Sequence, residues 1–157
     1  NPILEFEDGF VTIKEENNPK NSLKYFYSDP SVVTSPSKTI TMPSKEVSFT
    51  LNGEDLNKLK RAAGVIQAPD LVLEKKNTDV YLTVKDKKND TANNYSLDVD
   101  VEGQGDYNFY FKVENLKLMP LTYDVKVSSK NISHFKSQTS NAVEYWIALE
   151  PESSYSE

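Results

Sequence analysis

The residues of this sequence that could do chemistry are few and stand apart from one another. His134 is the only histidine and there is no cysteine, so neither a histidine metal cluster nor thiolate chemistry is available. Gly103 and Gly105 lack the following Lys-Ser/Thr pair of a phosphate-binding loop, and no HExxH or Ser-His-Asp spacing occurs. A lone histidine beside apolar residues is typical of a surface or core-edge position, so the sequence predicts a protein that is not an enzyme.

Acidic residues between positions 98 and 106 raise the question of a divalent cation site. Asp98, Asp100 and Glu102 alternate with other residues, so a continuous strand would place them on one face at a spacing of about 6–7 Å. Carboxylates in that arrangement can bind Ca²⁺ or Mg²⁺, but a solvated strand face has the same pattern and is far more common. We therefore expect no metal and no cofactor, and keep a metal-dependent enzyme as a remote third alternative.

A basic helical surface within residues 52–66 is the strongest remaining candidate. The apolar residues of this segment recur at helical spacing and predict one buried face: Leu56, Leu59, Ala63 and Ile66. Asn57, Lys58 and Arg61 fall on the opposite side, where cations can contact phosphates without reading bases. Asn52 is the predicted N-cap and Gly64 the predicted C-cap. The alternative is a helix face that charge merely makes soluble.

The other segments alternate in the manner of β-strands, which predicts a β-rich α+β fold. Residues 3–7 and 10–14 flank Asp8-Gly9, a strong hairpin signal. Further strands are predicted at 22–27, 46–51, 71–74, 80–85, 95–101, 107–112, 122–128, 132–137 and 143–149. Residues 114–119 predict a short helix that carries Lys117, a second candidate cation. The polar tail from Pro151 is predicted to fray.

Composition bounds the class of protein and its partners. The 157 residues suit one domain, or one domain with part of another. The net charge of −6 argues against nucleic-acid binding by the whole surface and leaves room only for a local basic surface. No apolar run approaches the ~18 residues that a membrane span needs. The absence of cysteine is typical of an intracellular protein, and the opening directly in a strand pattern suggests an incomplete chain.

Several segments, in this order and spacing, resemble the DNA polymerase sliding clamps, above all those of tailed phages with contractile tails. They are 27–44 (YSDPSVVTSPSKTITMPS), the strand and helix that follow, 107–120 (YNFYFKVENLKLMP) and 145–152 (YWIALEPE). The resemblance covers the chain from about Tyr25 onward. It implies the sliding-clamp fold, shared with the eukaryotic proliferating cell nuclear antigen, in which helices line a central hole and sheets lie outside.

The resemblance also implies a domain plan and a function. Residues 1–28 would be the last strands of a first domain that lacks its start, 29–45 the interdomain connector, and 46–157 a second domain. The pattern alone favours the alternative, in which the strands 3–7, 10–14 and 22–27 add to one continuous sheet. The implied function is a processivity factor, a ring that encircles duplex DNA and tethers the replicative polymerase without catalysis. Its implied partners are duplex DNA, DNA polymerase, an ATP-driven clamp loader and, when the chain is complete, two further copies in a homotrimer. A membrane is not among them, and the implied location is the host cytoplasm during phage replication. The alternative is a β-rich phage structural or protein-binding module without enzymatic activity.

Three surfaces follow from the same resemblance. The DNA-facing residues would be Asn57, Lys58, Arg61 and Lys117. The pocket for partner peptides would contain Val32, Val33, Ile40, Met42, Ile147, Leu149 and Pro151, although Ile147 and Leu149 have a place in the core as their alternative. The subunit interface would pair strand 22–27 with strand 95–101 through Leu23, Tyr25, Tyr27, Tyr95, Leu97 and Val99. Such pairing would also protect strand edges that otherwise invite aggregation.

Overall fold

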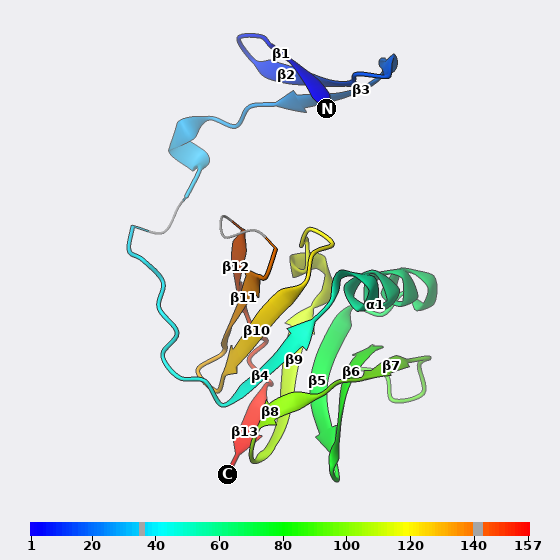
Figure 1. Ribbon diagram of the computed structural model, residues 1–157, viewed down its shortest axis with the longest axis vertical. Helices are drawn as coiled ribbons and strands as arrows, with labels where there is room; N and C mark the ends of the chain where they lie inside the picture. Colours follow the sequence, from blue (N-terminus) through cyan, green and yellow to red (C-terminus); the bar gives the residue numbers. More distant parts are fainter. Residues whose placement is uncertain (35–36, 140–142) are drawn as a thin grey trace. The chain divides into compact units, whose positions relative to one another are not determined.

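The computed structural model describes residues 1–34, 37–139 and 143–157, which form two compact units, Asn1–Thr39 and Ile40–Glu157 (Figure 1). The boundary between the units falls inside the predicted connector 29–45. Pro36, one of the prolines behind that prediction, lies outside the described residues. The assignment of 1–28 and 46–157 to two clamp domains stays a prediction.

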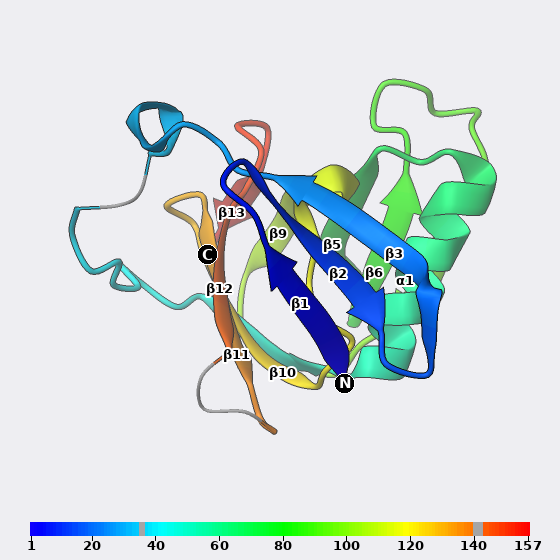
Figure 2. The same cartoon turned by 90° about the horizontal axis from the view of Figure 1, so that it is seen from above.

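The first unit is a three-stranded antiparallel sheet in the order β1-β2-β3 (Figure 2). Its strands are β1 (Pro2–Phe6), β2 (Phe10–Glu15) and β3 (Asn18–Phe26). The predicted turn at Asp8-Gly9 joins the first two, and β3 begins four residues earlier than predicted. A short 3₁₀ helix, η1 (Pro30–Val32), follows and is capped by the Asp29 carboxylate. Val11 is the only large apolar side chain that this unit buries among its described residues.

The second unit contains two five-stranded antiparallel sheets (Figure 1). The first, in the order β12-β11-β10-β4-β8, consists of β12 (Glu144–Ala148), β11 (Ile132–Ser137), β10 (Tyr123–Ser128), β4 (Val47–Leu51) and β8 (Val101–Gly103). The second, in the order β13-β9-β5-β6-β7, consists of β13 (Ser154–Ser156), β9 (Asp106–Lys112), β5 (Asp70–Lys76), β6 (Asp79–Lys85) and β7 (Tyr95–Asp98). The apolar faces of both sheets contribute to one core.

Helix α1 (Gly53–Ile66) packs on β6 and β7 and buries Leu56, Leu59 and Ala63, as its periodicity predicts. The Asn52 side chain accepts a hydrogen bond from the Asp55 N–H at 2.8 Å, which confirms the predicted N-cap. The predicted C-cap at Gly64 is wrong. The helix continues to Ile66, which packs on the core, and Gln67 ends it with φ 56°. No helix among the described residues has the length and apolarity needed to cross a membrane.

The predicted strand 95–101 is two strands in two sheets. β7 ends at Asp98, the chain crosses at Val99 and Asp100, and β8 then pairs with β4. Gly103 lets this crossing strand approach closely, because a Cβ there would lie 2.6 Å from the Glu46 carbonyl oxygen. The break removes the continuous strand face that placed the three acids together. Over the described residues, no group of three His, Cys, Asp or Glu side chains could hold a metal ion.

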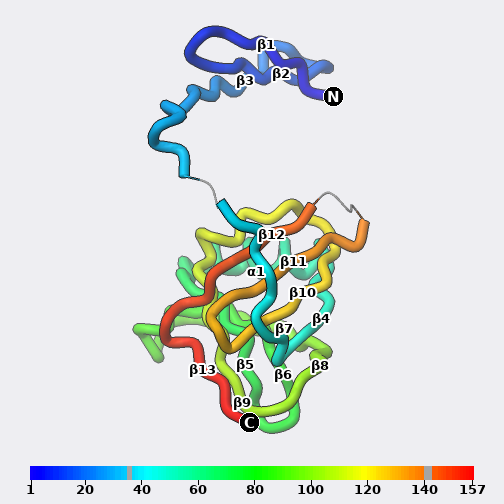
Figure 3. Tube along the Cα trace, turned by 90° about the vertical axis from the view of Figure 1, so that its left-hand side faces the viewer, coloured from blue at the N-terminus to red at the C-terminus, as the bar shows by residue number. Residues whose placement is uncertain are grey.

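The short helix and the tail also differ from their predictions. Within and beside the predicted helix 114–119, only the 3₁₀ turn η2 (Val113–Asn115) is helical. The segment then leaves helical geometry, because the side chains of Leu116 and Leu118, two residues apart, both point into the core. The tail does not fray: β13 pairs with β9, and the chain can be followed in Figure 3 from β12 to this edge. The Tyr155 ring stacks on Phe109 with centroids 6.4 Å apart. An aromatic residue at a sheet edge thus anchors a segment whose composition is otherwise polar.

Loss of stability at alkaline pH is expected from Tyr123, which is fully buried and donates its hydroxyl hydrogen to the Met119 carbonyl at 2.8 Å. Burial, reinforced by Tyr145, raises its pKa from 10.0 to about 12. The stability that this group contributes is therefore complete below pH 10 and is lost as the pH rises to about 12. Two pKa units correspond to about 2.7 kcal/mol. Denaturant titrations across this range should show a shallower pH dependence for Tyr123→Phe, and an unchanged dependence would contradict the assignment.

Candidate nucleic-acid interface

The face of α1 opposite its buried side is exposed to solvent. Asn57, Lys58 and Arg61 are exposed on the side opposite the buried leucines. The first turn is fixed by Gly53, where an added Cβ would lie 2.6 Å from the Pro120 carbonyl oxygen. This close approach holds the segment after η2 against the start of the helix. The predicted DNA-facing residues of α1 are therefore accessible and stand on a rigid element.

The charges on this face are not equivalent. Lys58 Nζ pairs with Glu54 at 2.9 Å and with Asp55 at 3.1 Å. The hydrogen bonds that Lys58 donates to Glu54 and then to Asp55 raise its pKa, so its charge is present but is offset by two carboxylates. Arg61 has no ion pair within the described part of the chain. Arg61 is thus the cation of this face that is free to meet a phosphate.

Lys117 is exposed, but it is not on a helix. It lies between the buried Leu116 and Leu118 in the extended segment after η2. Alternation, rather than helical periodicity, directs its side chain outward. Its role toward DNA stays a prediction.

The residues predicted for the peptide pocket lie in different settings. Val32 and Val33 are exposed in the first unit, whereas Ile40 and Met42 are half-buried in the second. Pro151 is exposed, and Ile147 and Leu149 each expose only 6% and belong to the core. Ile147 on β12 and Leu149 just after it are both buried in the core, so the core alternative describes these two residues. Because Val32 and Val33 belong to the first unit and the other five residues to the second, the pocket stays a prediction.

The residues predicted for the subunit interface lie on two sheet edges. Leu23, Tyr25 and Tyr27 are exposed by 60%, 59% and 45% on or just after β3. Tyr95 on β7 is exposed, and Leu97 and Val99 are half-buried. β3 has only β2 as a neighbour and β7 has only β6, so the outer edges of both strands are unpaired in the described chain. The interface itself stays a prediction.

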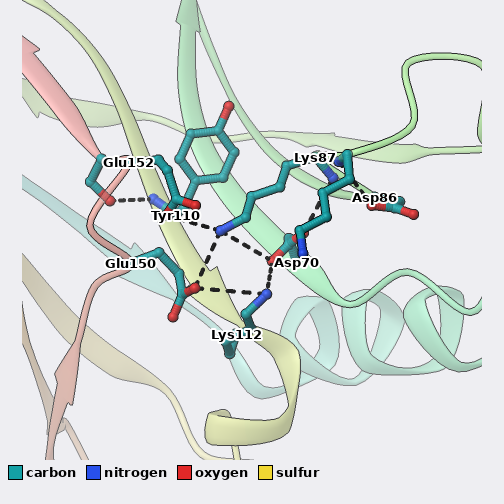
Figure 4. A network of polar contacts seen from close by, with 9 residues as sticks. Asp70, Asp86, Lys87, Tyr110, Lys112, Glu150 and Glu152 are labelled. Carbon is teal, nitrogen blue, oxygen red and sulfur yellow. Dashed lines mark hydrogen bonds and ion pairs between the residues drawn. The ribbon is translucent and has the colours of Figure 1, made fainter.

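A charged cluster that the sequence did not predict joins the tail to the second sheet (Figure 4). Asp70, only 1% exposed, accepts Lys112 Nζ at 2.7 Å and the Lys87 backbone N–H at 3.2 Å. Lys87 Nζ reaches Glu150 at 3.2 Å and Glu152 at 3.1 Å. Burial lowers the pKa of Lys87, but the hydrogen bonds to Glu152 and Glu150 outweigh it and the pKa is raised. The cluster fastens the segment after β12 to the second sheet.

Comparison with known proteins gives relatives among phages. The chain is 26% identical to the sliding clamp of Vibrio phage KVP40 over 156 residues, which are 96% of this chain and 68% of that protein. It is 26% identical to the sliding clamp of Enterobacteria phage T4, over 98% of this chain and 68% of that protein. The chain thus spans about two thirds of the length of these relatives.

Solved structures share its fold. The proliferating cellular nuclear antigen of Entamoeba histolytica matches with a TM-score of 0.56 at 17% identity, over 95% of this chain and 63% of that chain. The DNA polymerase sliding clamp of Bacillus subtilis matches with a TM-score of 0.56 at 12% identity, over 95% of this chain and 40% of that chain. These likenesses confirm the predicted clamp fold. Residues 48–151, about two thirds of the chain, match the family described as "gp45 sliding clamp, C terminal", and the chain therefore belongs to the gp45 sliding clamps.

Proposed function

We propose that this chain acts as a DNA polymerase processivity factor, in a ring that encircles duplex DNA and catalyses nothing itself. The observation that carries the proposal is α1, a sheet-backed helix whose exposed face carries Arg61, which pairs with no carboxylate among the described residues. Membership of the gp45 sliding clamps supports the ring. The unpaired edges of β3 and β7 offer each copy two different surfaces for its neighbours, which suits a closed ring of three copies.

Sliding needs contacts that hold the ring to DNA weakly and without a preferred sequence. Arg61 and Asn57 can donate hydrogen bonds to phosphate oxygens. Lys58 and Lys117 add positive charge near the duplex without a defined phosphate contact. Phosphate contacts position a protein on the duplex but carry no base information. The net charge of −6 disfavours DNA on other surfaces, which keeps the duplex at the basic face. Closure of the ring then prevents escape, and the tether raises the effective concentration of polymerase at the primer end.

The remaining partners of the proposal come from the resemblance. An ATP-driven loader would open the ring, and polymerase would dock a peptide beside the exposed or half-buried residues Val32, Val33, Ile40, Met42 and Pro151. The protein would act in the host cell during phage replication. The alternative, a β-rich structural module, needs no duplex DNA in its assembly.

Retention on DNA circles tests the proposal. The protein, in its longest natural form, should have the mass of three chains by light scattering. Loaded by its phage loader onto nicked circular duplex, it should stay bound during gel filtration and be lost when the circle is cut. A structural module would dissociate from circular and linear DNA alike, and that result would overturn the clamp proposal. Closed circles and cut circles of the same sequence are the matched control.

A further inference from the structure

The chain just before β4 lies along the second unit with one of its faces turned inward. From position 40 to position 46 the even-numbered residues are half-buried and the odd-numbered ones are exposed, which is the alternation of an extended strand. The inward residues are two apolar ones, Ile40 and Met42, followed by two polar ones, Ser44 and Glu46. Figure 1 shows this segment reaching β4 beside the turn between β10 and β11. The polar pair therefore stands where the predicted connector meets the sheet.

The Glu46 carboxylate collects hydrogen bonds from both sides of this junction. The Ser129 backbone N–H donates to Glu46 Oε2 at 2.8 Å, and the Ser129 hydroxyl donates to Oε1 at 2.9 Å. The Ser44 hydroxyl donates to Oε2 at 3.2 Å. Burial alone would raise the pKa of Glu46, but the hydrogen bonds from Ser129 and Ser44 outweigh it and the pKa is lowered. The carboxylate is therefore charged at neutral pH, and a charged acceptor forms the stronger hydrogen bonds.

Ser128 extends this group of side chains into the protein. It is 0% exposed, its hydroxyl oxygen lies 2.6 Å from that of Ser44, and it accepts the Lys130 backbone N–H at 3.1 Å. A serine hydroxyl has one hydrogen to donate. Because Ser44 gives its hydrogen to Glu46, Ser128 must donate to Ser44. These side chains, which we call the Glu46 cluster, thus form a directed chain of donors that ends on one carboxylate, and the bonds of such a chain strengthen one another. Its members are Ser44, Glu46, Ser128 and Ser129.

The Glu46 cluster is the polar fastening of this part of the connector. Within residues 37–46, every side-chain hydrogen bond to a described residue involves Ser44 or Glu46. The Glu46 N–H donates to the Val127 carbonyl at 3.2 Å, next to the ladder of β4 and β10. Residues 37–45 make no backbone hydrogen bond to a described residue. Ser44 and Glu46 therefore decide how far the order of β4 extends into the connector.

The turn that binds Glu46 also holds the chain after β12. The Leu149 N–H donates to the Asn131 carbonyl at 3.0 Å, and Asn131 is the last residue before β11. Pro151 follows two residues later and belongs to the predicted peptide pocket, as do Ile40 and Met42. One turn therefore fastens both segments that the second unit contributes to that pocket.

We propose that Glu46 is a positioning residue, which fastens the connector to the turn between β10 and β11 and thereby places Ile40 and Met42 for a docked partner. The backbone of these two residues has no described hydrogen-bond partner, so their position depends on packing and on the Glu46 cluster. Order that exists before docking lowers the entropy cost of binding. The inference rests on the proposed function for the identity of the partner, a peptide of DNA polymerase, and not for the fastening itself.

Two variants test the fastening in the free chain. Glu46→Ala removes the acceptor of the Ser129 N–H, so this amide hydrogen should exchange with solvent at least about tenfold faster, measured by NMR. The ¹⁵N order parameters of residues 40–45 should fall in the same variant, while those of β4 stay unchanged. Ser44→Ala should lower the same order parameters but leave the exchange of Ser129 within a few fold, because Glu46 and Ser129 stay bonded. Glu114→Ala, the same change at an exposed residue of η2, is the matched control and should alter neither quantity.

Binding of the DNA polymerase of the same phage tests the positioning. Glu46→Ala and Ser44→Ala should each weaken this binding by about threefold to tenfold by calorimetry, since only the fraction of molecules with an ordered connector is ready to bind. Glu46→Gln keeps one acceptor oxygen and should have an intermediate effect. A residue that only stabilised the fold would lower the melting temperature without changing the affinity of the folded protein, and circular dichroism checks that each variant is folded.

The two measurements separate this inference from the proposed function. Unchanged exchange of Ser129 together with unchanged order parameters in Glu46→Ala would overturn the fastening. A more mobile connector with unchanged polymerase affinity would overturn the positioning role. Failure of the unaltered protein to bind polymerase would overturn the proposed function instead, and the fastening would still be measured in the free chain.

Discussion

Arg61→Glu is expected to abolish most of the DNA affinity that the α1 face supplies. Arg61 is exposed and has no carboxylate partner in the described chain, so its full charge is available to phosphate. Loss of one phosphate contact per copy should lower the slope of log K against log salt by about one for each copy in the ring. The accompanying reversal of charge repels the duplex. A fall in affinity of at least about tenfold at low salt is expected.

Salt titrations of DNA binding measure this effect, and two further variants serve as its control and its comparison. Lys130→Glu makes the same change of charge in the turn between β10 and β11 and should leave the slope unaltered. Lys58→Ala should have a smaller effect than Arg61→Ala, because Glu54 and Asp55 already offset the Lys58 charge. Equal losses for Lys130→Glu and Arg61→Glu would mean that net charge, and not the α1 face, governs binding.

Asp70→Ala is expected to lower the free energy of unfolding by about 3 kcal/mol, because it leaves a buried ion-pair network without its central acid. Asp70 is only 1% exposed and holds Lys112 at 2.7 Å as well as the Lys87 backbone N–H. Both amines keep Glu150 as a partner, which places the loss at the lower end of the range for broken buried pairs. Urea denaturation measures the change.

A double-mutant cycle separates the ion pair from simple loss of packing. Lys112→Met in the Asp70→Ala background removes one of the two amines that have lost Asp70 as a partner. It should restore part of the lost stability, so that the two changes are less than additive. Additive losses would show that Asp70 and Lys112 do not depend on each other.

Local patterns allowed much of this fold to be predicted. The helical spacing of Leu56, Leu59 and Ala63 fixes which side of α1 is buried, and therefore that Arg61 is exposed. The hairpin at Asp8-Gly9 and the N-cap at Asn52 also depend on neighbours in the sequence. The sequence also contains the signal for the ion pair that offsets the Lys58 charge, because Glu54 and Lys58 have the i,i+4 spacing of a helical ion pair.

The features that were missed depend on partners far apart in the chain. The crossing at Val99 and Asp100 follows from where β4 lies, which alternation along 95–101 cannot reveal. The docking of Tyr155 on Phe109 and the link from Asp70 through Lys112 to Glu150 have the same origin. Ile147 and Leu149 show the limit for the candidate site, because an apolar residue on a strand has the same pattern whether it lines a pocket or the core.

Each of the two sheets in the second unit contains strands from both the early and the late part of the chain, and this has a consequence for cleavage. Loop 86–94 joins β6 to β7 and is rich in polar residues, which is the kind of segment that proteases cut. A cut there would leave β4 hydrogen-bonded to β8 and β10, and β5 hydrogen-bonded to β9. Both sheets would therefore still contain strands from each fragment. The nicked protein should remain a single particle, and its two pieces, produced separately, have the complementary edges to reassemble.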